Sequence, residues 1–145
     1  MNTISRLKLS EGVNPTHLEL RRRSRQWQQE LQTLEMESQF LQQLINRILF
    51  RLEDPLRAEE LKQLNARAQY FNSTNLPALR EATAWSLHLP QWASHPEQVH
   101  NFQMAQRLID KEKNRLATIK AQVYQIFDRL TQSDPMQWHG GVTIW

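Results

Sequence analysis

Residues 27–52 read WQQELQTLEMESQFLQQLINRILFRL, and one apolar pattern runs through them without a break. The pattern advances by alternating steps of four and three residues through Trp27, Leu31, Leu34, Ser38, Leu41, Ile45, Ile48 and Leu52. Such spacing places all of these side chains on one face of an α-helix, as in the seam of a coiled coil. Ser38 is the only polar member. We therefore predict a long helix that packs along its length against another helix.

A second seam near the other end of the chain follows the same rule. Its members are Phe102, Ala105, Ile109, Glu112, Leu116, Ile119, Val123, Ile126 and Leu130. Because two seams of matching length can pack against each other within one chain, we interpret the 27–52 seam as a wall of an intramolecular bundle and not as a dimer interface. Glu112 is expected at the edge of its seam, paired with an arginine of the first helix such as Arg47.

Turn signals divide the chain into predicted helices over about 15–53, 55–72, 76–89 and 96–132. Asp54 as N-cap and Pro55 at the first helical position predict a tight corner. Asn72-Ser73-Thr74-Asn75 favour caps and turns, and predict an interruption of the middle segment. Without a change of direction there, the fold is an elongated antiparallel bundle of three long rods with the middle one interrupted; with a reversal, it is a four-helix bundle. The fold class is all-α in both cases.

The composition suits a single domain. The chain has 145 residues, of which 39% are hydrophobic, enough for one core. Its three glycines disfavour a turn-rich β fold, and its lack of cysteine excludes thiol chemistry, disulfides and cysteine-based zinc sites. We predict one helical-bundle domain over residues 14–133, an N-terminal arm over 1–13 and a C-terminal tail over 134–145, with both arms irregular or strand-like.

The charge and hydropathy patterns predict a soluble, cytoplasmic protein. Residues 1–12 lack the continuous apolar core of a secretory signal, and no stretch approaches the roughly 20 apolar residues of a membrane helix. The formal net charge of +3 is modest, so any contact with a polyanion must depend on local clustering.

Four arginines form the sharpest local feature of the chain: Arg21, Arg22, Arg23 and Arg25. They fall in the early turns of the first predicted helix, where positive charge opposes the helix dipole. One interpretation is a contact with phosphates or with an acidic protein surface. The alternative is a group of solvated side chains beyond the packed part of the bundle, paired with acids such as Glu19 or Glu97. Nucleic-acid or polyanion binding through this cluster is therefore the second functional hypothesis.

The C-terminal stretch 136–145, MQWHGGVTIW, differs in kind from the rest of the chain. It holds two of the three glycines and two of the five tryptophans. We take Trp138, Val142, Ile144 and Trp145 as candidate partner-binding residues, in a segment that adds to the sheet edge of a partner or fills a groove. The alternatives are that it folds back on its own bundle or pairs with residues 4–9 as a two-stranded ribbon.

The sequence contains no motif that is typical of an enzyme active site. There is no glycine-rich phosphate loop and no nucleophile elbow. Glu97 and His100 form one Glu-x-x-His pair, whereas di-iron bundles use two. We therefore predict no catalytic residue, no metal, no cofactor and no small-molecule substrate, and an all-α metalloenzyme is only the third functional hypothesis. Trp27, Trp85 and Trp92 are expected to be packing residues at the bundle ends.

The first functional hypothesis follows from the two seams and the unusual tail. We expect a non-enzymatic interaction module, such as an adaptor, an assembly factor or a structural subunit. It would present a helical face and its terminal arms to a protein partner, or to further copies of itself in an oligomer.

Overall fold

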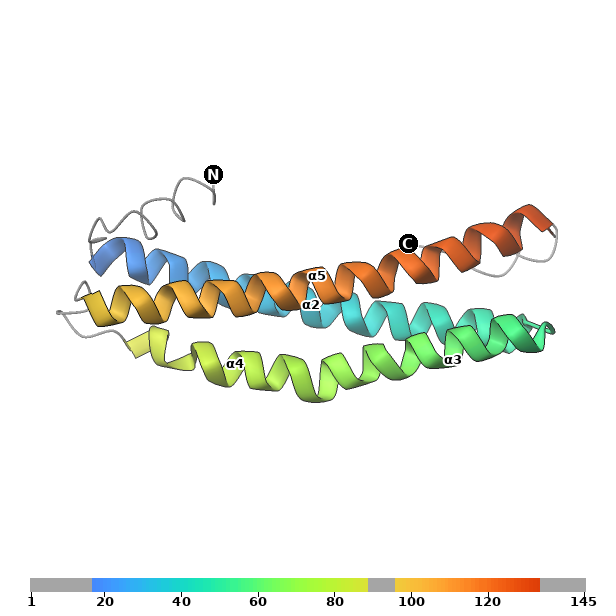
Figure 1. Ribbon diagram of the computed structural model, residues 1–145, viewed down its shortest axis with the longest axis horizontal. Coiled ribbons are helices and arrows are strands. Elements are labelled where there is room, and N and C mark those ends of the chain that lie inside the picture. Colours follow the sequence, from blue (N-terminus) through green and yellow to red (C-terminus); the bar gives the residue numbers. More distant parts are fainter. Residues whose placement is uncertain (1–16, 89–95, 134–145) are drawn as a thin grey trace.

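The chain folds into three helical rods that lie side by side in an elongated bundle (Figure 1). A computed structural model describes residues 17–88 and 96–133, so both predicted arms lie outside the described residues. The first rod is α2 (His17–Arg51) and the third is α5 (Pro96–Ser133). The middle rod consists of α3 (Pro55–Tyr70), a π-helical turn η1 (Phe71–Asn75), α4 (Leu76–Ala84) and a 3₁₀ turn η2 (Trp85–His88). The all-α class is confirmed, and the four-helix alternative is wrong.

The corner between α2 and α3 forms as predicted. Asp54 is the N-cap of α3, with an extended backbone at φ −76° and ψ 114°. Its Oδ1 accepts a hydrogen bond from the backbone N–H of Leu56 at 3.0 Å and a longer one from Arg57 at 3.5 Å. Pro55 occupies the first turn, where a missing N–H costs nothing. The corner therefore sends the middle rod directly back along α2.

The predicted interruption at residues 72–75 coincides with the π-helical turn η1, which separates α3 from α4 while the chain stays helical and keeps its direction. The inward residues of the middle rod are Leu61, Leu64, Ala68, Phe71, Leu76, Leu79, Thr83 and Ser86. The step from Phe71 to Leu76 is one residue longer than the helical repeat allows. A π-turn takes up the additional residue and keeps both side chains on the buried face, while Ser73 and Thr74 remain exposed.

Both predicted seams lie in the core. Every member of the α2 seam is buried except Leu52, which is partly buried at the corner. In α5 the seam is buried from Phe102 to Ile126, apart from Glu112, and Leu130 packs partly buried against the core. The core is thus one continuous cluster along the bundle axis.

Glu112 does not pair with Arg47. Its carboxylate accepts a hydrogen bond from Asn75 Nδ2 at 3.1 Å and forms an ion pair with Arg115 at 3.6 Å. Arg47 is exposed. Glu112 lies beside the π-turn of the middle rod, whereas Arg47 lies two residues beyond a seam position of α2 and faces away from the core, so the two side chains do not meet.

Ion pairs align α2 with α5. Glu30 pairs with Lys113 at 3.5 Å, and Glu37 pairs with Lys120 at 3.7 Å. Each pair joins residues 83 positions apart (30 to 113 and 37 to 120), so the two helices run parallel with a constant register. Arg80 of α4 adds an ion pair with Glu35 of α2 at 2.8 Å. Within residues 17–88 and 96–133, no helix has the length and apolar character needed to cross a membrane.

Candidate functional site

The outer face of α2 carries a second row of residues with helical spacing. Each member follows a seam residue by two positions, which is about 200° around the helix. We call these residues the outer row: Thr33, Met36, Phe40, Gln43, Arg47 and Phe50. Met36 is 63% exposed and Phe50 is 91% exposed, while Phe40 is half-buried. Large apolar side chains aligned on one exposed face are typical of an interaction surface.

An open groove lies between α2 and α5 beside this row. The α2–α5 groove has a volume of about 580 Å³ and is lined by Thr33, Met36, Glu37, Gln39, Phe40, Leu41, Gln43, Lys120 and Tyr124. Four of these residues belong to the outer row, so groove and row form one surface. No residue of the middle rod lines the groove, which places it on the side of the bundle that the middle rod leaves uncovered.

The wall contributed by α5 combines a cation and an aromatic ring. Lys120 Nζ lies 5.9 Å from the centroid of the Tyr124 ring, within cation–π range. The same ammonium group pairs with Glu37 across the groove. Burial, and secondly the negative charge of Glu37, raise the pKa of Tyr124 above its ordinary value of 10.0. The phenol is therefore neutral near pH 7 and offers an apolar ring with one hydrogen-bonding group.

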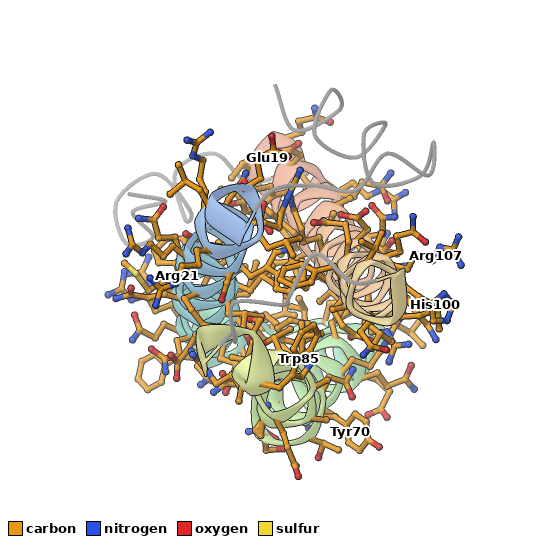
Figure 2. The ribbon with its side chains drawn as sticks, turned by 90° about the vertical axis from the view of Figure 1, so that its left-hand side faces the viewer. Glu19, Arg21, Tyr70, Trp85, His100 and Arg107 are labelled. Atoms are coloured by element: carbon orange, nitrogen blue, oxygen red, sulfur yellow. The ribbon has the colours of Figure 1, made fainter. Side chains whose placement is uncertain are left out.

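The end of the bundle near the start of α2 is closed by aromatic packing. The rings of Trp27 and Phe102 lie 4.8 Å apart, and Trp85 meets Phe102 edge-on at 5.0 Å. Trp27 is fully buried, and its Nε1–H donates to Gln106 Oε1 at 2.7 Å. In the end-on view Trp85 points into the bundle (Figure 2). The prediction that Trp27 and Trp85 are packing residues is confirmed, and Trp92 lies outside the described residues.

The four arginines of residues 21–25 differ in their exposure to solvent. Arg21, Arg22 and Arg25 are exposed, and Figure 2 shows Arg21 pointing outward. Arg23 is only 5% exposed, unlike the other three arginines predicted to bind a partner. The next residue, Ser24, bonds Ser86 between their Oγ atoms at 2.6 Å, and the Ser86 hydroxyl donates to a backbone carbonyl. Residues 23 and 24 therefore face the interior.

The structure describes only some of the remaining candidates of the sequence analysis. His100 is exposed, and the side chain of Glu97 lies outside the described residues. Among the residues the structure describes, no group of three potential ligands could hold a metal ion. Trp138, Val142, Ile144 and Trp145 also lie outside the described part of the chain.

The sequence analysis missed the outer row and Gln106. The row was visible as Met36, Phe40 and Phe50 at helical spacing, within the stretch that also contains the seam. Gln106 had a weaker signal: a buried tryptophan needs an acceptor for its N–H, but the sequence does not say which residue provides it.

Comparisons with known proteins identify no relative. No family model matches the chain, and no match is found among curated proteins or among solved structures. The function must therefore be inferred from the residues of this chain.

Proposed function

We propose that the protein is a non-enzymatic interaction module that binds a helix of a protein partner along the outer row and the α2–α5 groove. The observation that carries this proposal is the alignment of Met36 and Phe50, both highly exposed, with a groove walled by Phe40 and Tyr124. Amphipathic helices bind in such grooves through anchor residues at helical spacing.

The geometry of two parallel helices supports a helical occupant. Neighbouring helices in bundles pack about 8–10 Å apart, and the valley between two of them is suited to a third. In this molecule the middle rod fills the valley on one side, and an added helix would fill the other, as in a four-helix bundle. Glu37 and Lys120 would then lie at the polar rim around an apolar centre, which is the usual arrangement of an interface.

The test compares Met36→Glu with Tyr70→Glu as baits in quantitative affinity capture. Both positions are exposed and apolar, but Tyr70 lies on the middle rod, away from the groove. A buried charge should lower the capture of a groove partner at least tenfold, which corresponds to about 1.4 kcal/mol. Tyr70→Glu should retain that partner. Equal capture by both variants, with circular dichroism showing both folded, would contradict the proposal.

The C-terminal candidates extend the same proposal. Trp138, Val142, Ile144 and Trp145 would supply further apolar contacts to the partner, with Trp145 as an anchor. Deletion of residues 136–145 should then weaken capture of the same protein that Met36→Glu loses. Capture unchanged by the deletion would remove these four residues from the proposed interface.

Polyanion binding is the second candidate, and the exposure of Arg21, Arg22 and Arg25 supports it. Phosphate contacts make affinity strongly dependent on salt. The triple variant R21Q/R22Q/R25Q should elute from a heparin column at lower salt than R67Q/R107Q/R129Q, which removes the same charge from exposed positions elsewhere. Equal shifts of both variants would show an effect of net charge alone and contradict a specific site.

A further inference from the structure

We propose that the helix docked on the outer row is α2 of a second copy of this chain, running antiparallel to the first. The inference rests on the proposed function, because it identifies the partner of the same surface. The resulting dimer has two-fold symmetry, the commonest arrangement of homo-oligomers, in which one surface patch meets itself.

The distribution of charge along α2 selects the antiparallel direction. Residues 26–46 contain three glutamates and no lysine or arginine, whereas residues 47–51 contain two arginines and no acid. Antiparallel pairing places the basic end of each helix over the acidic segment of the other. Parallel pairing would bring Arg47 against Arg47 and Arg51 against Arg51. Opposite charges at the edges of helix pairs determine their orientation in this way.

The outer row also defines the register. Aligning both rows over their full length in opposite directions puts the two-fold axis between residues 41 and 42. Across the axis, Thr33 then faces Phe50, Met36 faces Arg47, and Phe40 faces Gln43. Every layer therefore contains one apolar side chain and one polar side chain. A parallel alignment would instead produce three layers that are entirely polar, one of them with two arginines in contact.

Acceptors for the arginines are in place on the surface. In this register Arg47 of one copy lies at the level of Met36 of the other, between Glu35 and Glu37. The side chains of these glutamates are each 41% exposed. Each already pairs with one cation of its own chain, Arg80 or Lys120. A carboxylate has two oxygens and accepts several hydrogen bonds, so each can contact a second cation.

Cysteine cross-linking tests both partner and direction, because the natural chain has no cysteine. In the double variant Met36→Cys/Arg47→Cys the two thiols of one chain are separated by about 16 Å along the helix, at 1.5 Å per residue. A disulfide requires Cα atoms within about 7 Å, so none can form within the chain. In the antiparallel dimer the two positions face each other across the interface. Mild oxidation should therefore yield a covalent dimer.

The single variants Met36→Cys and Arg47→Cys are the matched controls. Antiparallel pairing holds identical positions about 16 Å apart along the axis, so neither single variant should cross-link. We expect at least tenfold more covalent dimer from the double variant than from either single one. Both positions of substitution are exposed, and circular dichroism verifies that each variant is folded.

Three outcomes would overturn the inference. Equal cross-linking of the single Met36→Cys variant would indicate parallel pairing or random collision. A monomeric mass by light scattering, without cross-linking of the double variant, would exclude a second copy. A monomeric Met36→Cys variant whose introduced thiol resists alkylation would show that the chain covers its own groove.

The capture experiment separates the failure of this inference from the failure of the proposed function. If Met36→Glu still loses a captured protein that Tyr70→Glu retains, the proposed function stands with another occupant. If Met36→Glu loses no such protein, both proposals fail.

Discussion

Arg23 illustrates how strongly the environment of a residue depends on its position around a helix. It lies within a run of arginines, yet it is 5% exposed while Arg22 is exposed. One residue corresponds to about 100° of helix rotation, which is enough to move a side chain from solvent to the interior. Arg23 also takes part in at least one interaction. We therefore expect Arg23 to contribute to stability, whereas its exposed neighbours can contact a partner.

Because of this difference in burial, the same substitution at positions 23 and 22 should change the free energy of unfolding by different amounts. Arg23→Gln should lower the free energy of unfolding by about 1–3 kcal/mol, because it changes a buried polar side chain. Arg22→Gln should change it by about 0.5 kcal/mol or less, as is usual for exposed positions. Urea denaturation followed by circular dichroism measures both values. Equal effects of the two substitutions would contradict the burial of Arg23.

The ionisation of Tyr124 makes the stability of the folded chain depend on pH. Its pKa is raised in the folded chain above the ordinary value of 10.0, so the folded state holds the phenolic proton more tightly than the unfolded state. The associated stability is complete below about pH 10 and is lost as pH rises through the folded pKa. Denaturation at several pH values from about 9 to 11 should show this decline, and Tyr124→Phe should reduce it.

Glu37→Gln provides an independent measurement of the same effect. It removes the negative charge that contributes to the shift, so the ultraviolet titration of Tyr124 should move to lower pH. An unchanged titration in Glu37→Gln, together with an unchanged pH dependence in Tyr124→Phe, would show that the surroundings of Tyr124 in the groove do not shift its pKa.

At the scale of the elements, the π-turn of the middle rod explains the polar member of the α2 seam. Ser38 is fully buried, and its hydroxyl donates to the carbonyl of Ala68 at 3.2 Å. Ala68 lies at the end of α3, where the N–H of Phe71 is shared between the carbonyls of Arg67 and Ala68. The hydroxyl thus supplies a donor where the regular helical hydrogen bonding changes. A leucine at position 38 could not do so.

Because the π-turn contains one residue more than a regular helical turn, we expect the middle rod to tolerate the deletion of one residue there. Deletion of Ser73, which is exposed, should convert the π-turn into a regular helical turn and keep Phe71 and Leu76 on the buried face. We expect a folded protein with a free energy of unfolding within about 1 kcal/mol of the wild type.

Ala117 is the matched control for this deletion, because it is also exposed but lies in a helix without a π-turn. Its removal rotates the following residues by about 100° and turns Ile119 and Val123 away from the core. That variant should lose cooperative thermal unfolding by circular dichroism. Unfolding of the Ser73 variant to the same degree would contradict the role assigned to the π-turn.

At the scale of the whole molecule, the proposed register fixes the shape of the dimer. Its axis lies between residues 41 and 42, away from the middle of α2 (His17–Arg51), so the two bundles are staggered. Each α2 extends 15 residues beyond the end of the other, which is about 22 Å at 1.5 Å per residue.

Small-angle X-ray scattering can measure this stagger. The maximum dimension of the wild-type dimer should exceed that of the monomeric Met36→Glu variant by about 22 Å. A bundle paired without stagger would show almost no increase. An end-to-end pair would show an increase of about 57 Å, which is the length of α5.

The sequence determines most of this architecture but not its surfaces. The seams and the Asp54-Pro55 corner could be predicted, because helical periodicity and capping act locally. The place of the interruption at residues 72–75 could be predicted as well, but its π-helical form could not, because that form depends on the burial of both Phe71 and Leu76. The outer row has helical spacing in the sequence, but only the packed structure shows that a groove lies beside it.

The parallel arrangement of α2 and α5 has a consequence for the order of folding. The α2–α3 hairpin closes through the short corner at residues 52–54 and costs little loop-closure entropy, whereas contacts between α2 and α5 join residues 83 positions apart (30 to 113). During synthesis α5 also leaves the ribosome after α2 and the middle rod. The groove therefore exists only once α5 has been made and docked, so a chain truncated before α5 cannot form the α5 wall of this binding surface.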